Sequence, residues 1–126
     1  MVVDTRVCEV NASAQEAGQA LVRPEVRAVF VCDDGRLVGV VTRKTLVREV
    51  VAAGLDPRTT DVGGIAEDPI ATVVSDMPLE DAFHFLEERD LERVPVVEDG
   101  RLVGVLSRSG IQRRLAEDAP PAEEPA

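Results

Sequence analysis

The chain carries one nine-residue segment twice, and this duplication limits what it can fold into more than any other feature. Residues 35–43 read Gly-Arg-Leu-Val-Gly-Val-Val-Thr-Arg, and residues 100–108 read Gly-Arg-Leu-Val-Gly-Val-Leu-Ser-Arg. At the same offset of 65 positions, the similarity extends over about residues 7–50 and 72–115, which is most of the 126-residue chain. Two related units in so short a chain leave little room for a separate catalytic domain.

One repeat alone is too small to bury a stable core, so the two copies are expected to pack together. We predict an α+β fold in which two βαββα repeats form one compact, pseudo-symmetric body with a shared core. The expected division is repeat 1 at residues 1–58 and repeat 2 at 59–117, with a linker over 55–68. Residues 118–126 are acidic and rich in proline, and are expected to form a disordered tail.

Repeat 1 shows the expected order of elements in its hydrophobic pattern. Ser13 and Glu16 have the spacing of a capping box at the start of a helix. Gly54 follows a second helix as its C-terminal cap, and Leu46, Val47, Val50 and Val51 are expected on one face of that helix. The predicted strands are 7–10, 29–32 and 37–41, the predicted helices are 13–22 and 43–53, and a tight turn is expected at 33–35.

Repeat 2 gives the same order. Pro78 marks the start of an amphipathic helix, in which Leu79, Phe83 and Leu86 fall at helical spacing. The predicted strands are 71–74, 94–97 and 102–106, the predicted helices are 78–89 and 109–116, and a tight turn is expected at 98–100.

The charge of the chain argues against a nucleic-acid partner. Acidic residues number 24 against 14 basic ones, a formal net charge of −10. Proteins bind duplex nucleic acid largely through Lys and Arg that neutralise phosphates. Three phenylalanines, with no Tyr or Trp, also leave few rings on which single-stranded bases could stack.

The first residues do not resemble an export signal, because Asp4, Arg6 and Glu9 interrupt them. No apolar run approaches the length that crosses a bilayer, so we expect a cytoplasmic protein without a membrane contact. Cys8 and Cys32 are then expected as reduced, buried strand residues. A redox or metal role is the minority alternative, because no CxxC motif or Cys/His cluster surrounds either cysteine.

Two segments carry a resemblance to a known family. They are Val-Pro-Val-Val-Glu-Asp-Gly-Arg-Leu-Val-Gly-Val at 94–105 and Phe-Val-Cys-Asp-Asp-Gly-Arg-Leu-Val-Gly-Val at 30–40. With the order of elements, they resemble the CBS domain, named after cystathionine β-synthase, and two in tandem resemble a CBS pair, or Bateman module, over about residues 5–117. The resemblance implies a sensor that binds adenine nucleotides or adenosyl compounds between the repeats, forms a homodimer and controls a partner protein without being an enzyme.

The residues themselves indicate a phosphate site in each repeat. Thr42 and Ser107 each end a strand just before a helix, where a hydroxyl and free backbone N–H groups can point at one anion. Arg43 and Arg108 follow them and could clamp phosphate oxygens, and Lys44 adds a charge in repeat 1. The alternative is that the hydroxyls only cap their helices and the arginines are solvated.

The resemblance extends the candidate site and also shows a departure from the family pattern. The family has an Asp three residues after the hydroxyl residue to bind ribose, whereas this chain has Thr45 and Gly110. Phe30 replaces the proline of the base pocket in repeat 1 and is expected to fill it. The further ligand-binding residues that the resemblance implies are Thr72, Val73, Arg93, Val94 and Pro95 in repeat 2, with Val7, Cys8 and Val29 in repeat 1.

No constellation in the sequence supports catalysis. There is no nucleophile paired with a base and no Gly-rich phosphate loop, and His84 has no neighbouring Cys or second His to make a metal site. The leading hypothesis is a regulatory module that needs no cofactor and binds AMP, ADP, ATP, S-adenosylmethionine or another phosphate-bearing metabolite. The alternatives are a ligand-independent dimerisation or docking module with degenerate nucleotide sites, and an enzyme with an unrecognised site.

Overall fold

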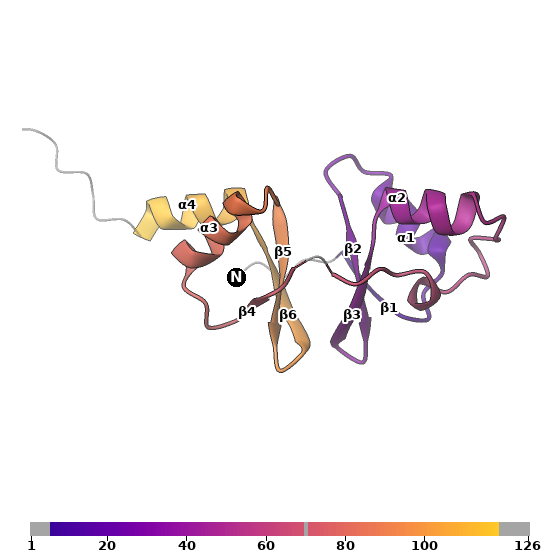
Figure 1. The fold of residues 1–126 in the computed structure, drawn as a ribbon, viewed down its shortest axis with the longest axis horizontal. Coiled ribbons are helices and arrows are strands. Elements are labelled where there is room, and N and C mark those ends of the chain that lie inside the picture. The colour runs from indigo at the N-terminus through magenta and orange to yellow at the C-terminus, as the bar shows by residue number, and fades with distance from the viewer. Residues whose placement is uncertain (1–5, 70, 119–126) are drawn as a thin grey trace, which may run out of the picture.

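Two β-hairpins, one from each copy of the repeated segment, lie at the centre of the structure (Figure 1). The structure is a computed structural model that describes residues 6–69 and 71–118. The first hairpin joins β2 (Val29–Asp33) to β3 (Arg36–Val41), and the second joins β5 (Arg93–Glu98) to β6 (Arg101–Ser107). Each turn is an Asp-Gly pair with positive φ at both residues, the geometry that matches the twist of a two-residue hairpin. Both predicted hairpins are confirmed.

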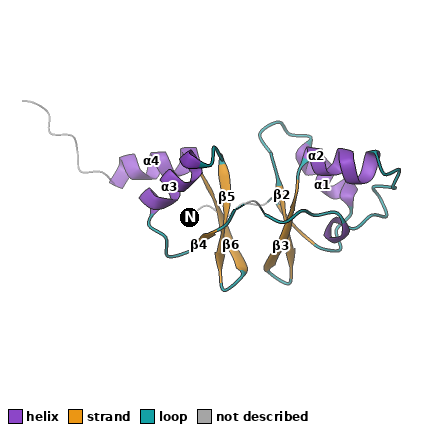
Figure 2. Cartoon of the chain, in the orientation of Figure 1, coloured by secondary structure: helices purple, strands orange, loops and turns teal. Residues whose placement is uncertain are grey.

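The remaining elements repeat around these hairpins. The strands β1 (Val7–Glu9) and β4 (Val73–Val74) lie parallel to β2 and β5, and the helices α1 (Ala14–Leu21) and α3 (Leu79–Glu88) make the crossovers. The six strands follow the palindromic order β1-β2-β3-β6-β5-β4. The helices cover the outer sides of the strands, so the two hairpins face one another (Figure 2). The predicted βαββα order is confirmed in both repeats, and with it the α+β fold class.

The contact between the repeats is reciprocal at the tips of the two hairpins. The Leu37 N–H donates to the Gly100 carbonyl at 3.1 Å, and the Leu102 N–H donates to the Gly35 carbonyl at 2.9 Å. The Arg101 guanidinium lies over Gly35, and the Arg36 guanidinium lies over Gly100, where a Cβ would be 2.6 Å from it. The repeated Gly-Arg pair therefore forms the junction of the two copies: each glycine supplies the turn and the space that the other copy's arginine occupies.

The buried apolar residues do not form the single shared core that the chain length suggested. Most of them form two clusters, each between the sheet and the helices of one repeat, and Phe30, Cys32 and Val105 are buried outside both clusters. The expectation of a shared core was wrong because the faces that the hairpins turn toward each other carry arginines, glycines and an open cleft. The largest fully buried side chains are those of Leu86, Ile111, Val26, Val29, Val31, Val41, Val62, Val73, Val94, Val96 and Thr45.

The predicted linker is largely structured. Within it, residues 61–67, which we call the strap, contain a 3₁₀ turn at Val62–Gly64 and pack on repeat 1. Val62 and Ile65 are buried in the core of that repeat, and Val40 pairs with Glu67. The apolar Val62 and Ile65 were the available signal, but two residues three positions apart are too few to define a helical or an alternating pattern.

The second helix of repeat 1 also differs from its prediction. The helix α2 (Arg43–Leu46) continues as a π-helical turn, η1 (Val47–Val51). The wider turn leaves Val50 buried but Val47 and Val51 exposed, so the predicted single apolar face is wrong. In repeat 2, α4 (Arg108–Asp118) runs to the last described residue, and the rest of the predicted disordered tail lies outside the described residues.

Two glycines test how tightly the strap is packed. A Cβ on Gly39 would lie 2.6 Å from the Ala66 Cβ, whereas on Gly18, in α1, it would meet Leu46 at 3.6 Å. We expect Gly39→Ala to lower the free energy of unfolding by about 1–3 kcal/mol through overpacking. Gly18→Ala should raise it by about 0.5–1 kcal/mol, because alanine favours a helix. Urea unfolding measures both, and a Gly39→Ala protein as stable as wild type would show that the strap packs loosely.

Candidate functional site

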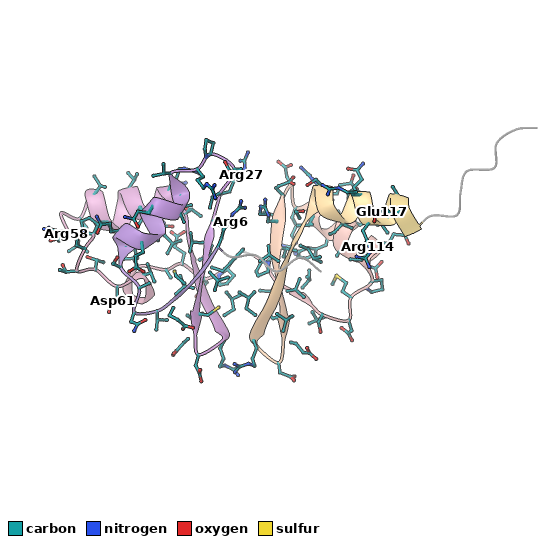
Figure 3. All side chains as sticks on the ribbon, turned by 180° about the vertical axis from the view of Figure 1, so that it is seen from behind. Arg6, Arg27, Arg58, Asp61, Arg114 and Glu117 are labelled. Carbon is teal, nitrogen blue, oxygen red and sulfur yellow. The ribbon has the colours of Figure 1, made fainter. Side chains whose placement is uncertain are left out.

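A cleft of ≈ 510 Å³ opens between the two repeats, at the end of the hairpins away from their tips. Both repeats contribute to it, and three pairs of equivalent positions face one another across it: Arg27 with Glu92, Ala28 with Arg93, and Phe30 with Pro95. In Figure 3, Arg6 and Arg27 are labelled on the side of repeat 1 that faces repeat 2. The remaining lining residues are Val40, Thr42, Pro69, Ala71, Asp90, Leu91 and Arg108.

The cleft brings together one half of each predicted phosphate site. Thr42 of repeat 1 and Arg108 of repeat 2 both line it, although the sequence suggested that each would work with its own neighbour. Arg43 instead donates to the Arg23 carbonyl at 2.8 Å. Ser107 lies in a different groove, within repeat 2. The structure thus favours one site shared by the repeats over two local sites.

The hydroxyls of Thr42 and Thr45 bond to each other and cap α2. Thr42 Oγ1 accepts from the Thr45 N–H at 3.3 Å, and Thr45 Oγ1 accepts from the Thr42 N–H at 3.1 Å. Thr45 is fully buried, and its hydroxyl donates to Glu67 of the strap at 3.2 Å. Arg48 forms an ion pair with the same carboxylate. Thr45 therefore faces the strap, while Thr42 lies between this network and the cleft.

The equivalent hydroxyl in repeat 2 also acts as a helix cap. Ser107 Oγ accepts from the Gly110 N–H at 3.0 Å. Gly110 has no side chain to extend this contact, and a Cβ there would be 2.6 Å from Ser107 Oγ. The capping alternative therefore describes the geometry of both hydroxyls, with Thr42 alone of the two also lining the cleft.

Two acidic residues that line the cleft, Asp90 and Glu92, are not among the site residues predicted from the sequence. Asp90 lies 3.8 Å and Glu92 3.6 Å from the Arg108 guanidinium. The Arg108 N–H also donates to the Glu92 carbonyl at 2.7 Å. A usable signal was their position directly before the strand that begins at Arg93. The cleft wall thus carries three arginines and two carboxylates, a net charge near +1.

The other predicted residues divide between the cores and the surface. The side chains of Val29, Val73 and Val94 are buried in the two cores. Thr72 is exposed beside Ala71, which does line the cleft. Arg93 and Pro95 line it as expected, and Phe30, predicted to fill a pocket, is buried in its wall. Val7 lines a separate groove of ≈ 190 Å³ beside β6.

Cys8 and Cys32 are free thiols on neighbouring strands. Burial raises the pKa of Cys8 to about 11, and the nearby Cys32, Glu16 and Glu9 add to the effect. Burial also raises the pKa of Cys32. Both are therefore protonated at neutral pH, the form that suits strand packing and not nucleophilic chemistry.

His84 lies on the surface of α3, 3.6 Å from Glu87 and edge-on to the Phe83 ring. Over the described ranges, no three His, Cys, Asp or Glu side chains gather closely enough to hold a metal ion. No described helix has the length and apolar character needed to cross a membrane.

Comparison with known proteins gives concordant results. A family model described as CBS domain matches residues 1–52 and 62–117. Hypoxic response protein 1 of Mycobacterium tuberculosis (strain ATCC 25618 / H37Rv) is 36% identical over 104 residues, covering 82% of this chain and 73% of that protein. A crystal structure of Hypoxic Response Protein I with two coordinated zinc ions is 31% identical, with a TM-score of 0.72, and covers 91% of this chain and 94% of that one.

A second solved structure resembles this chain to a similar degree. The crystal structure of CBSX2 in complex with AMP is 28% identical, with a TM-score of 0.72, over 93% of this chain and 92% of that one. The likeness extends over both repeats and the junction between them, which supports the arrangement of the two hairpins described above.

The thiol chemistry gives a prediction. Peptide mass spectrometry can follow the alkylation of Cys8 by iodoacetamide as a function of pH. In the folded protein the alkylation rate should rise with pH and reach half of its maximum near pH 11, the pKa of the buried thiol. In urea-unfolded protein the half-maximal rate should lie near pH 9.0, the ordinary pKa of a cysteine thiol. Since the folded-state pKa is the higher one, this group stabilises the fold below about pH 9, and its contribution is lost as the pH rises toward 11. The same midpoint in both states would contradict the burial of this thiol.

Proposed function

Because the chain belongs to the CBS domain family, we propose that it is a regulatory module that binds an adenosyl ligand in the cleft between its repeats. The observation that carries the proposal is the cleft itself, which is lined by apolar and charged residues of both repeats. Its volume of ≈ 510 Å³ lies within the range of small-molecule sites, roughly 300–1,000 Å³. AMP in the related CBSX2 crystal structure supports the ligand class.

The lining residues suit the three parts of such a ligand. Phe30, Pro95 and Leu91 offer apolar surface to a purine ring. Arg27, Arg93 and Arg108 also line the cleft and can bind phosphate oxygens. A ligand that spans the cleft would contact both repeats at once, which a regulatory ligand requires.

The ribose of such a ligand must be bound by residues other than the Asp of the family pattern, which this chain lacks. Thr45 is committed to Thr42 and the strap, and Gly110 has no side chain. Asp90 and Glu92 are the carboxylates that line the cleft, and a carboxylate accepts from sugar hydroxyls. We assign ribose recognition to these two residues, which replace the missing Asp from the opposite side of the site.

The same carboxylates limit the charge of the ligand. Arg108 already lies close to Asp90 and Glu92, so a phosphate must compete with them for the guanidinium. A net charge near +1 in the cleft favours a monophosphate or an uncharged adenosyl compound over ATP. AMP is therefore the ligand of choice, and ATP the weaker one.

Regulation follows only if the ligand prefers one relative arrangement of the repeats. The hairpin tips join the repeats at one end and the cleft separates them at the other, so a bound ligand would set the angle between them. We infer that a partner protein in the cytoplasm reads this angle.

The two equivalent arginines provide a matched test of the cleft. We expect AMP at about 100-fold excess over its Kd to stabilise wild type by about 2.7 kcal/mol, visible as a rise in melting temperature. Arg108→Ala should remove most of that rise, since Arg108 lines the cleft. Arg43→Ala should keep it, since Arg43 binds the Arg23 carbonyl instead.

The panel for this thermal-shift experiment is AMP, ADP, ATP, NAD and S-adenosylmethionine. A response to none of them at millimolar concentration would overturn the sensor proposal. A response that Arg43→Ala abolishes and Arg108→Ala leaves intact would place the ligand outside the cleft.

A second candidate function is constitutive dimerisation without a ligand. The observation that favours it is a row of exposed apolar side chains at Val47, Val51 and Leu55, spaced four residues apart along η1 and the following turn. Two copies could bury this row against each other about a two-fold axis.

Two exposed valines test this candidate. We expect Val51→Lys to shift the mass measured by light scattering from dimer to monomer, because it places a charge in the row. Val22→Lys is the control, since Val22 is equally exposed at the end of α1 and outside the row. A Val51→Lys protein that keeps the dimer mass would exclude this surface.

A further inference from the structure

The Thr45 hydroxyl uses all of its capacity for hydrogen bonds. A hydroxyl has one proton to donate and two lone pairs that accept. Thr45 Oγ1 donates to Glu67 Oε2 at 3.2 Å, accepts from the Thr42 N–H at 3.1 Å and lies 3.0 Å from Thr42 Oγ1. These partners fill every position on the oxygen, so this fully buried group has none left for a ligand.

Glu67 determines the direction of the Thr45 proton. An ionised carboxylate has no proton to give, so Glu67 can only accept from Thr45. The other carboxylate oxygen, Oε1, forms an ion pair with Arg48, which requires the ionised form. The single proton of the Thr45 hydroxyl is therefore committed to Glu67. It follows that Thr42 is the donor in the contact between the two hydroxyls.

This order of bonds leaves Thr42 with one acceptor position. Its proton goes to Thr45, and one of its lone pairs accepts from the Thr45 N–H at 3.3 Å. The second lone pair remains, on a half-buried residue that lines the cleft. An unprotonated phosphate oxygen also only accepts, so it would meet this lone pair with no proton between them.

We propose that Glu67 is a specificity-determining residue: through Thr45 it makes Thr42 an acceptor toward the cleft, so that Thr42 binds a hydrogen-bond donor of the ligand and not its phosphate. This inference rests on the proposed function, since it names the group of an adenosyl ligand that Thr42 recognises. Such a ligand carries donors in two places, the hydroxyls of its ribose and the amino group of its adenine. The phosphate is left to the arginines of the cleft.

Glu67→Gln should reverse the order of the bonds. The amide oxygen keeps an acceptor toward Arg48, so the NH₂ group faces Thr45 and donates to it. Both lone pairs of Thr45 Oγ1 are then occupied, and its proton must go to Thr42 Oγ1. The Thr42 proton becomes free to point into the cleft. Asp68→Asn removes the same charge from the next residue, which is exposed, and is the matched control.

Proton NMR on the ligand-free protein tests the order of the bonds. Coupling to the β-proton of the same residue assigns each hydroxyl proton. In wild type and Asp68→Asn, the Thr45 hydroxyl proton should show its stronger nuclear Overhauser effect to the γ-protons of Glu67. In Glu67→Gln the stronger effect should be to the β-proton of Thr42. A wild-type Thr45 hydroxyl proton that lies beside Thr42, or that exchanges with water too fast to be seen, would overturn the proposal.

Calorimetry with AMP and its analogues tests the ligand side. Each analogue lacks one donor: fluorine replaces the 2′- or the 3′-hydroxyl, or hydrogen replaces the 6-amino group. We expect one analogue to bind wild type and Asp68→Asn about tenfold more weakly than AMP, with the loss reduced to about twofold in Glu67→Gln. A fluorinated analogue with this behaviour identifies a ribose hydroxyl as the group at Thr42, and the analogue without the amino group identifies the adenine.

Two outcomes separate this inference from the function on which it rests. Losses that are equal in wild type, Glu67→Gln and Asp68→Asn would overturn the role of Glu67, because the affected donors then bind elsewhere, as at Asp90 or Glu92. Absence of AMP binding in every protein would overturn the proposed function, and the hydroxyl protons of the ligand-free protein would still decide the order of the bonds.

Discussion

The reciprocal contact at the hairpin tips determines the arrangement of everything else. Two backbone hydrogen bonds join β3 to β6, and each arginine of the repeated Gly-Arg pair lies over the other copy's glycine. Gly35 and Gly100 have φ of 85° and 80°, a conformation that glycine adopts without strain. Because this contact fixes one end of the two hairpins, their other ends diverge, and the cleft is the space they leave. The same residues that close the turn therefore position Thr42 and Arg108 at a common site.

The duplicated scaffold has become asymmetric in how its grooves are filled. In repeat 1, the buried Thr45 donates to Glu67 of the strap, and the exposed Arg48 pairs with the same carboxylate. In repeat 2, the counterpart of Thr45 is Gly110, which lines a groove of ≈ 290 Å³ between the described residues. A buried hydroxyl must find partners within the protein, and that of Thr45 finds them in Thr42 and in Glu67 of the strap. The cleft reflects this asymmetry, since it takes its hydroxyl from the repeat that has the network and its arginine from the repeat that lacks it.

Local features of the fold were predictable from the sequence, and contacts between distant segments were not. The Asp-Gly turns between apolar strands predicted both hairpins, and the offset of 65 allowed the prediction for one repeat to be compared with that for the other. The π-helical turn was not predicted, because hydrophobic periodicity assumes an α-helix of 3.6 residues per turn. Val47 and Val51 fit that period in the sequence, but their side chains are exposed to solvent. Asp90 and Glu92 were not predicted as cleft residues. They lie in a segment of mixed charge at 87–93, and the sequence of such a segment does not show which charged residue faces the other repeat. The pairing of Thr42 with Arg108 required knowing that the hairpins meet at their tips.

The network around Thr42 joins the cleft to the outer surface of repeat 1. Thr42 contacts Thr45, Thr45 contacts Glu67, and Glu67 contacts Arg48, which lies in η1 between the exposed Val47 and Val51. A ligand that draws a hydrogen bond from the Thr42 hydroxyl competes with the cap of α2, and the loss would pass to the strap through Thr45. The proposed ligand cleft and the exposed apolar row therefore lie at the two ends of one set of contacts within repeat 1.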